Sequence, residues 1–295
     1  MQGVSRTAQY VALFRALESA RPAEERLFDD PLARSCLDGR LARAADLARV
    51  PGFRQAVLAL VDRRSPGTRL AVVIRTRFID DALRAALDEG LDQVVLLGAG
   101  FDSRAHRIPG IELTRVFEVD HPDTQAAKRE RVRARLGAEP AHVVYVPVDF
   151  DRQDVASELA AAGLRTGARS FFVLEGVISY LTAEAVDQTF RTVAGAGGPG
   201  SQIAFTYLHR DVVDGSRPIL GSWQAQSRVA AAGEPWRFGF DPTEVPGYLA
   251  TRGLELVEDV SPAEAAPRYV RAEHRPAAAF YRLARACRAE RPSGH

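Results

Sequence analysis

Glycine and acidic residues follow a series of short apolar segments in the middle of the chain. A Gly-Ala-Gly turn at 98–100 comes directly after the first segment, and the next three segments end in Asp120, Asp149 and Glu175. Glycine lets the backbone turn tightly and approach a ligand closely. A carboxylate about twenty residues after the glycines can accept hydrogen bonds from both hydroxyls of a ribose. Together these residues indicate a site for a ligand that carries a nucleoside and a positive charge.

The segments that must position these residues alternate between strand and helix patterns from residue 93 to 207. Apolar runs of strand length occur at 94–97, 113–119, 143–148, 171–174 and 202–207, with helix-like segments between them at 123–136, 154–162 and 183–194. This alternation predicts an α/β fold in which helices cover both faces of a parallel sheet. In such a sheet a ligand binds at the carboxyl ends of the strands, where the glycines and acids lie.

The first ninety residues have a helical pattern. Ser5 or Thr7 can cap a first helix, and Pro31 can open a second. An apolar face from 70 to 87 predicts a third helix that ends at Gly90. We therefore expect residues 1–90 to form a helical cap.

We expect all residues, 1–295, to form one domain. Residues 91–207 of this domain form the part that would bind a nucleoside cofactor. Residues 208–240 lack clear periodicity and are interpreted as a lid insertion. Residues 241–295 complete the sheet, with a helix at 242–251, a strand at 254–260 and a strand or helix at 278–285.

The composition excludes several classes of protein. Lys+Arg is 39 and Asp+Glu is 38, and this balance gives no sign of a nucleic-acid or membrane-surface binder. No apolar run reaches the length of a membrane span, and no signal peptide is recognisable, so a cytoplasmic location is expected. Cys36 and Cys287 form neither a disulfide framework nor a zinc motif, so no metal is expected. Lys128 is the only lysine beside a large arginine excess, which we interpret as genomic bias.

Two nucleoside cofactors compete for the site at the strand ends. NAD needs its pyrophosphate at a glycine-rich helix N-terminus, and a full GxGxxG motif would require glycine where this chain has Ser103. Asp102 would repel that pyrophosphate. S-adenosyl-L-methionine carries no phosphate, and its ammonium and sulfonium cations are attracted by carboxylates. The residues therefore favour S-adenosyl-L-methionine over NAD.

Four ordered blocks resemble the motifs of the leucine carboxyl methyltransferase-like family. They are the arginine-bearing helix at 75–81, the LGAGFDSR block at 97–104, the EVDHP block at 118–122 and the EGVISYL block at 175–181. The family includes protein phosphatase carboxyl methyltransferases and bacterial polyketide O-methyltransferases. The resemblance implies a class I methyltransferase fold, a Rossmann-like sheet of seven strands whose last strand is antiparallel.

The resemblance also implies roles for individual residues. Arg77 would pair with the methionine carboxylate of S-adenosyl-L-methionine, with Arg15 as an undecided second partner. Gly98 and Gly100 would pass close to the methionyl part, and Glu175 would lie near its amino group or sulfonium.

The nucleoside end of the cofactor would be held by the acids of the second and third strands. Asp120 would hold the ribose hydroxyls, with Glu118 as the weaker alternative. Asp149 and the backbone of Phe150 would meet the edge of the adenine.

The acceptor is expected to be a small molecule that is methylated on a carboxylate or hydroxyl, in secondary metabolism. A carboxylate needs no general base, whereas a hydroxyl gains from one, and His209 is the candidate because it follows the fifth strand. Tyr180, Tyr207 and Trp223 are expected to contact the acceptor, with core packing as the alternative for each. Other possibilities are a peptide or carbon acceptor, a protein that binds the cofactor without transferring its methyl group and, more remotely, a dehydrogenase.

Overall fold

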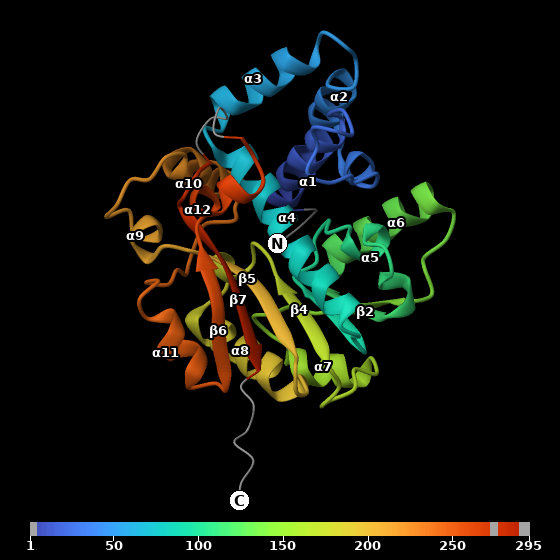
Figure 1. Ribbon diagram of the computed structural model, residues 1–295, viewed down its shortest axis with the longest axis vertical. Coiled ribbons are helices and arrows are strands. Elements are labelled where there is room, and N and C mark those ends of the chain that lie inside the picture. The colour runs from blue at the N-terminus through green and yellow to red at the C-terminus, as the bar shows by residue number, and fades with distance from the viewer. Residues whose placement is uncertain (1–4, 272–276, 289–295) are drawn as a thin grey trace, which may run out of the picture.

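The computed structural model describes residues 5–271 and 277–288, and its centre is a sheet of seven strands (Figure 1). The strands are β1 (Gln93–Leu97), β2 (Arg115–Asp120), β3 (Val143–Pro147), β4 (Ser170–Leu174), β5 (Gln202–Leu208), β6 (Leu254–Val260) and β7 (Tyr281–Arg288). Their order across the sheet is β3-β2-β1-β4-β5-β7-β6. The five strands predicted between residues 93 and 207 are thereby confirmed.

The last strand is the one that breaks the parallel arrangement. β1 to β5 pair in parallel, whereas β7 inserts between β5 and β6 and runs antiparallel to both. The segment left open as strand or helix at 278–285 is thus a strand. Because the chain order reverses at β1, the ends of β1, β2 and β4 diverge there and leave room for a ligand.

Helices cover both faces of the sheet, as the alternating pattern predicts. One face packs against α4 (Thr68–Asp88), α5 (Arg104–Arg107) and α12 (Pro262–Ala265), and the other against α7 (Val155–Ala161), α8 (Ala183–Ala196) and α11 (Val245–Ala250). α6 (Pro122–Leu136) lies against β2 and β3. The residues of the central strands β1, β4 and β5 are almost all buried, which explains their continuous apolar runs.

The first part of the chain forms a cap with a core of its own. It contains α1 (Arg6–Ser19), α2 (Gly39–Leu47) and α3 (Arg54–Arg64), and these helices lie at the same end of the sheet in Figure 1. The Ser5 side chain caps α1, as predicted. The prediction of a second helix that begins at Pro31 is wrong. The Asp30 carboxylate accepts the backbone N–H groups of Leu32 and Ala33 and closes a short turn there instead.

Four 3₁₀ turns connect these elements. They are η1 (Ala33–Cys36), η2 (Ile111–Leu113), η3 (Ile178–Tyr180) and η4 (Ala266–Arg268).

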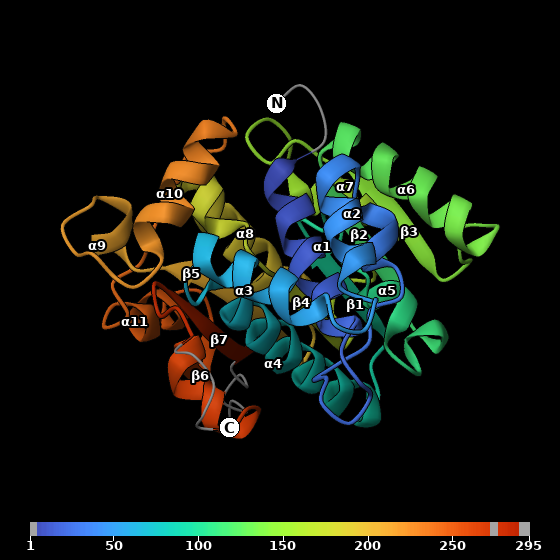
Figure 2. The same ribbon diagram turned by 90° about the horizontal axis from the view of Figure 1, so that it is seen from above.

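The segment interpreted as a lid contains two helices, α9 (Arg210–Val213) and α10 (Ser222–Ala231). Seen from above, α10 lies beside α3 and α1 over the sheet (Figure 2). In the ranges 5–271 and 277–288, no helix is both long and apolar enough to cross a membrane.

Candidate functional site

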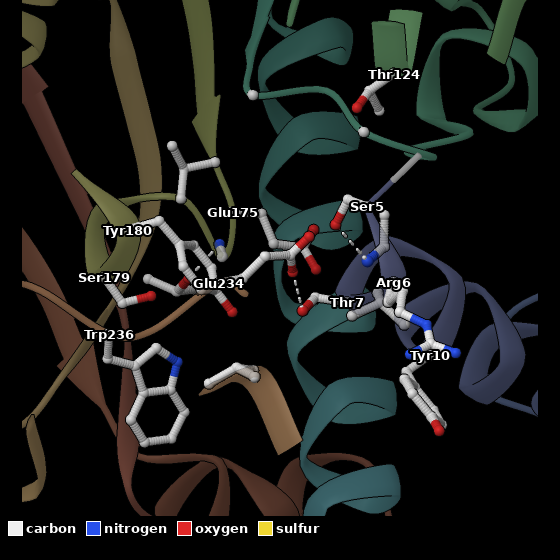
Figure 3. Close-up of a pocket in the computed structure, with 18 of the residues that line it drawn as sticks. Ser5, Arg6, Thr7, Tyr10, Thr124, Glu175, Ser179, Tyr180, Glu234 and Trp236 are labelled. Atoms are coloured by element: carbon white, nitrogen blue, oxygen red, sulfur yellow. Dashed lines mark hydrogen bonds between the residues drawn. The ribbon is translucent and has the colours of Figure 1, made fainter. Parts of the chain in front are cut away.

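A cavity of about 730 Å³ opens at the carboxyl ends of the parallel strands. Its floor comes from the ends of β1 to β5, and its walls come from α1, α4 and the segment that includes α10. Figure 3 shows side chains from these separate parts of the chain facing one another. The topology therefore brings the predicted strand-end residues to one place, where side chains from α1 and from the segment that includes α10 also line the cavity.

The glycine turn after β1 has a conformation that only glycine adopts easily. Gly98 has φ +67°, and a Cβ atom there would lie 2.3 Å from a methyl group of Val177. Gly100 has φ +47° and lines the same cavity. Because neither glycine has a side chain, the backbone of this turn can approach a ligand in the cavity closely.

Asp120 lies at the end of β2, next to the glycine turn. One of its carboxylate oxygens accepts the backbone N–H of Gly100, and the other accepts that of His121 at 2.6 Å. Burial raises the pKa of Asp120, and these two N–H groups partly offset that effect. The two bonds orient the carboxylate, and each oxygen keeps a lone pair for another donor.

Asp149 and Phe150 follow β3 and line the same cavity. The Asp149 carboxylate accepts the backbone N–H of Asp151 at 3.1 Å, and its own N–H is held by the Gln153 side chain at 2.9 Å. The ring of Phe150 packs against the core on the α8 side of the sheet. This end of the cavity therefore presents a carboxylate, backbone groups and an apolar wall.

Glu175 ends β4 and is bound by two buried arginines. Its oxygens lie 2.6 Å from Nε of Arg75 and 2.6 Å from Nη1 of Arg104. Burial would raise the pKa of Glu175, but the two cations outweigh it and leave the pKa below its ordinary value. Glu175 therefore stays ionised in the middle of the cavity.

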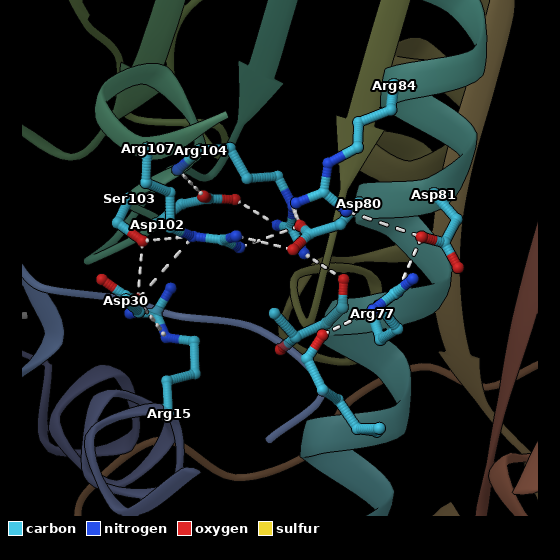
Figure 4. A network of polar contacts seen from close by, with 12 residues as sticks. Arg15, Asp30, Arg77, Asp80, Asp81, Arg84, Asp102, Ser103, Arg104 and Arg107 are labelled. Atoms are coloured by element: carbon cyan, nitrogen blue, oxygen red, sulfur yellow. Dashed lines mark hydrogen bonds and ion pairs between the residues drawn. The ribbon is translucent and has the colours of Figure 1, made fainter. Parts of the chain in front are cut away.

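Arg104 links the glycine turn to the rest of the site, a role that the sequence did not reveal. It is fully buried and donates to Asp80 of α4 at 2.8 Å and to Asp102 at 2.5 Å (Figure 4). It also donates to Glu175. Burial disfavours the charge of Asp102, but Arg104 lowers the pKa of that carboxylate below its ordinary value. Arg104 and Asp80 both lie inside blocks that carried the family resemblance, and that was the available signal.

The network of Figure 4 continues from α4 to the cap. Arg107 donates two hydrogen bonds to Asp80, at 2.6 and 2.8 Å, and Ser103 donates to Asp30 of the cap at 2.6 Å. The carboxylate of Asp30 also lies 3.4 Å from Nε of Arg15 in α1. Because these groups are buried and mutually paired, they hold the cap, the glycine turn and α4 in one arrangement.

The structure corrects the position expected for Arg77. This side chain does not line the cavity; it donates to Asp81 at 2.7 Å and to the carbonyl oxygen of Leu27 at 2.6 Å. Arg75 faces the cavity instead, because residues two apart on a helix project in nearly opposite directions. Arg15 also lines the cavity and donates to the carbonyl oxygen of Phe101 at 2.5 Å.

The aromatic side chains at the cavity differ in the hydrogen bonds that they make. Tyr180, Tyr207 and Trp236 line the cavity. The Tyr207 hydroxyl, however, donates to Asp259 of β6 at 2.5 Å and is engaged in the sheet. Burial raises the pKa of Tyr180, while hydrogen bonds with the side chains of Trp236 and Thr7 act against that rise. Trp236 lies beside Tyr180 (Figure 3).

The structure also corrects the positions expected for His209 and Trp223. Neither side chain lines the cavity, and Trp223 is 71% exposed. His209 begins α9, and its backbone N–H is held by the carbonyl oxygen of Phe280. Burial and then Arg282 lower the pKa of His209. Sequence proximity to β5 did not decide the direction of this side chain, because the chain turns into α9 at that residue.

Glu118 lies two residues before Asp120 in β2 and does not line the cavity. It is buried and pairs with the lone lysine, Lys128, at 2.7 Å, and His106 lies 3.6 Å from it. Burial raises the pKa of Glu118 to about 7, although Lys128 acts in the opposite direction. Burial and then Lys128 lower the pKa of His106 to about 3. Glu118 is therefore committed to a buried cluster, which leaves Asp120 as the acid at the cavity.

The donors and acceptors of the cavity suit S-adenosyl-L-methionine. Asp120 is an oriented carboxylate of the kind that accepts hydrogen bonds from ribose hydroxyls, and Glu175 is a second ionised carboxylate in the cavity, paired with Arg75 and Arg104. Within the described ranges no three His, Cys, Asp or Glu residues are grouped so as to hold a metal ion.

Comparisons with known proteins agree with this chemistry. A family model described as leucine carboxyl methyltransferase matches residues 8–194. A protein of Frankia alni is 39% identical over 227 residues, covering 76% of each chain, and one of Streptomyces coelicolor is 34% identical over 258 residues, covering 86% of this chain and 83% of that one. Both are named as candidate S-adenosyl-L-methionine-dependent methyltransferases.

Solved structures show the same fold at low sequence identity. A candidate methyltransferase from Thermobifida fusca has a TM-score of 0.58 at 18% identity and covers 94% of both chains. A protein of Streptomyces avermitilis has a TM-score of 0.55 at 17% identity, covering 81% of this chain and 91% of that one. The fold is the class I methyltransferase fold, and the chain belongs to the leucine carboxyl methyltransferase family of S-adenosyl-L-methionine-dependent methyltransferases.

Proposed function

We propose that this protein transfers the methyl group of S-adenosyl-L-methionine to an oxygen atom of a small molecule of secondary metabolism. The observation that carries the proposal is the cavity itself. The glycine turn and Asp120 line the same cavity as Tyr180 and Trp236, and we call the part beside Tyr180 and Trp236 the acceptor half. A cofactor and a small acceptor can therefore meet inside a single cavity.

Each part of the cofactor has partners in this arrangement. We assign the ribose hydroxyls to Asp120, and the adenine to Asp149 and Phe150. The methionyl part would lie along Gly98 and Gly100.

The ionic groups of the cofactor fall to three other residues. Its cationic part would face Glu175. Its carboxylate would pair with Arg75 or Arg15, which line the cavity, in place of Arg77.

The chemistry demands little of the protein beyond alignment. The bound cofactor supplies an activated methyl group on a sulfonium. The protein's residues hold the acceptor in line with that group, exclude water and, for a hydroxyl acceptor, remove a proton. In this proposal the cap at 1–90, the core at 91–207, the lid at 208–240 and the closing part at 241–295 act as one catalytic unit.

Thermal-shift measurements test the cofactor assignment. S-adenosyl-L-methionine and S-adenosylhomocysteine should both raise the melting temperature, and NAD should leave it unchanged. Stabilisation by NAD alone would instead support a dehydrogenase.

Transfer of the tritiated methyl group of labelled S-adenosyl-L-methionine tests the methyltransferase activity. A panel of small aromatic alcohols and carboxylic acids should yield at least one labelled product. Binding without any labelled product would indicate a protein that holds the cofactor but does not transfer its methyl group.

A further inference from the structure

The charges of the cavity lining leave two carboxylates without a cation. Six carboxylates line the cavity, and four of them pair with arginines. The pairs are Asp102 with Arg104, Asp149 with Arg152, Asp151 with Arg237, and Glu175 with Arg75 and Arg104. Within the ranges that the structure describes, Asp120 and Glu234 have no ion pair. Asp120 is accounted for by the ribose, and Glu234 is left without a role.

Glu234 follows α10 and is held over the acceptor half of the cavity. Its backbone N–H donates to the carbonyl oxygen of Val229 at 2.9 Å, which fixes the turn after the helix. Its carboxylate accepts a hydrogen bond from the hydroxyl of Thr7 in α1. Figure 3 shows Glu234, Thr7 and Tyr180 facing one another. The carboxylate is therefore positioned at the junction of cap, lid and cavity.

The cations near Glu234 are directed elsewhere. Arg228 donates to Ser65 at 2.7 Å and to the carbonyl oxygen of Arg64 at 2.5 Å. Arg6 also lines the cavity, but its side chain extends away from Glu234 (Figure 3). Because Arg75 is paired with Glu175, no arginine of the described residues forms an ion pair with the Glu234 carboxylate.

We propose that Glu234 binds a hydroxyl acceptor and receives its proton during methyl transfer. This inference rests on the proposed function and narrows its acceptor, because an anionic carboxylate acceptor would be repelled by Glu234. The acceptor oxygen bonds to the methyl carbon as the carbon–sulfur bond breaks, and that electron pair stays on the sulfur of the leaving S-adenosylhomocysteine. The hydroxyl proton passes to the Glu234 carboxylate, which releases it to water after the product leaves.

The first test compares matched probes on the protein saturated with S-adenosylhomocysteine. A naphthol, the corresponding naphthoic acid and a naphthylmethylamine are titrated by calorimetry. Wild-type protein should bind the naphthol at least about tenfold more tightly than the acid, and Glu234→Gln should bind the acid better than wild type does. Glu244→Gln is the matched control, because Glu244 pairs with Arg210 on the surface outside the cavity.

Three results of the probe test would overturn the inference. They are equal or tighter binding of the acid by wild type, no binding of any probe, and a preference for the amine that Glu234→Gln abolishes. The last result would make Glu234 the counter-ion of a cationic acceptor. All three results count only if wild-type protein binds S-adenosylhomocysteine. If wild-type protein does not bind S-adenosylhomocysteine, the proposed function itself is refuted.

The second test measures methyl transfer to a labelled product from the panel of alcohols and acids. Glu234→Gln should lower kcat about 100-fold with a smaller change in KM, and Glu234→Asp should recover part of kcat. The affinity of Glu234→Gln for S-adenosylhomocysteine should equal that of wild type. Labelling of acids in preference to alcohols, or unchanged kcat in Glu234→Gln, would contradict a proton-accepting role.

Discussion

Asp120 offers the sharpest test of the cofactor site, because its carboxylate is the oriented acceptor at the end of β2. In Asp120→Ala the two ribose hydroxyls lose this shared partner. A hydrogen bond to a charged group contributes about 1.5–3 kcal/mol, so two of them amount to about 3–6 kcal/mol. That loss corresponds to an affinity for S-adenosylhomocysteine that is lower by a factor of about 10²–10⁴.

The free protein also needs Asp120, and this sets a second expectation. The substitution leaves the N–H groups of Gly100 and His121 without their side-chain acceptor. Each unsatisfied buried donor costs about 1–3 kcal/mol, so the melting temperature should fall as well. Asp120→Asn keeps the shape and one oxygen acceptor, and it should retain more stability and more affinity than Asp120→Ala.

Isothermal titration calorimetry with S-adenosylhomocysteine measures the affinity, and circular dichroism verifies that each variant is folded. Asp123→Asn is the matched control, because Asp123 lies exposed in the first turn of α6. It should bind like wild type. A folded Asp120→Ala variant that binds within about threefold of wild type, less than 0.7 kcal/mol, would refute the ribose assignment.

Three further predictions concern the turn, the buried cluster and the lid. Gly98→Ala should lower the free energy of unfolding in urea by at least about 1–2 kcal/mol, because φ is +67° and the new methyl group would overlap Val177; a variant as stable as wild type would contradict this account. The pKa of His106 is lowered to about 3, so its stabilising contribution is present above pH 6.5 and is lost as the pH falls towards 3. His106→Gln should therefore flatten the decline in stability across this range, and an unchanged slope in urea titrations would be evidence against the shift. Trp236→Ala should weaken binding of the naphthol probe, whereas Trp223→Ala should not, because only Trp236 lines the cavity; equal effects in calorimetry would show that the lid closes differently.

The strands and the central acids could be predicted because their signals are local. Apolar runs, the Gly-Ala-Gly turn and acids at strand ends follow from what a buried parallel strand and a tight turn require. The parallel pairing of strands β1 to β5 follows from general rules of α/β connection. Asp120 and Glu175 could therefore be placed at one edge of a sheet before any coordinates.

The directions of single side chains could not be predicted in the same way. Arg75 and Arg77 have identical chemistry, and only the rotation of α4 against the sheet decides that Arg75 faces the cavity. His209 follows a cavity strand, yet the turn into α9 directs it elsewhere. A shift of one or two positions along the chain changes the outcome in each case.

The sequence by itself determined the sheet, the glycine turn and the strand-end acids, because each depends on local periodicity and local backbone geometry. Only the tertiary structure decided which charges remain free. Arg104 gathers Asp80, Asp102 and Glu175 from three separate parts of the chain, and Thr7 meets Glu234 across 227 positions. Ion pairing depends on distances of a few ångströms between residues far apart in the chain, and those distances arise only when the cap, the lid and the sheet pack together.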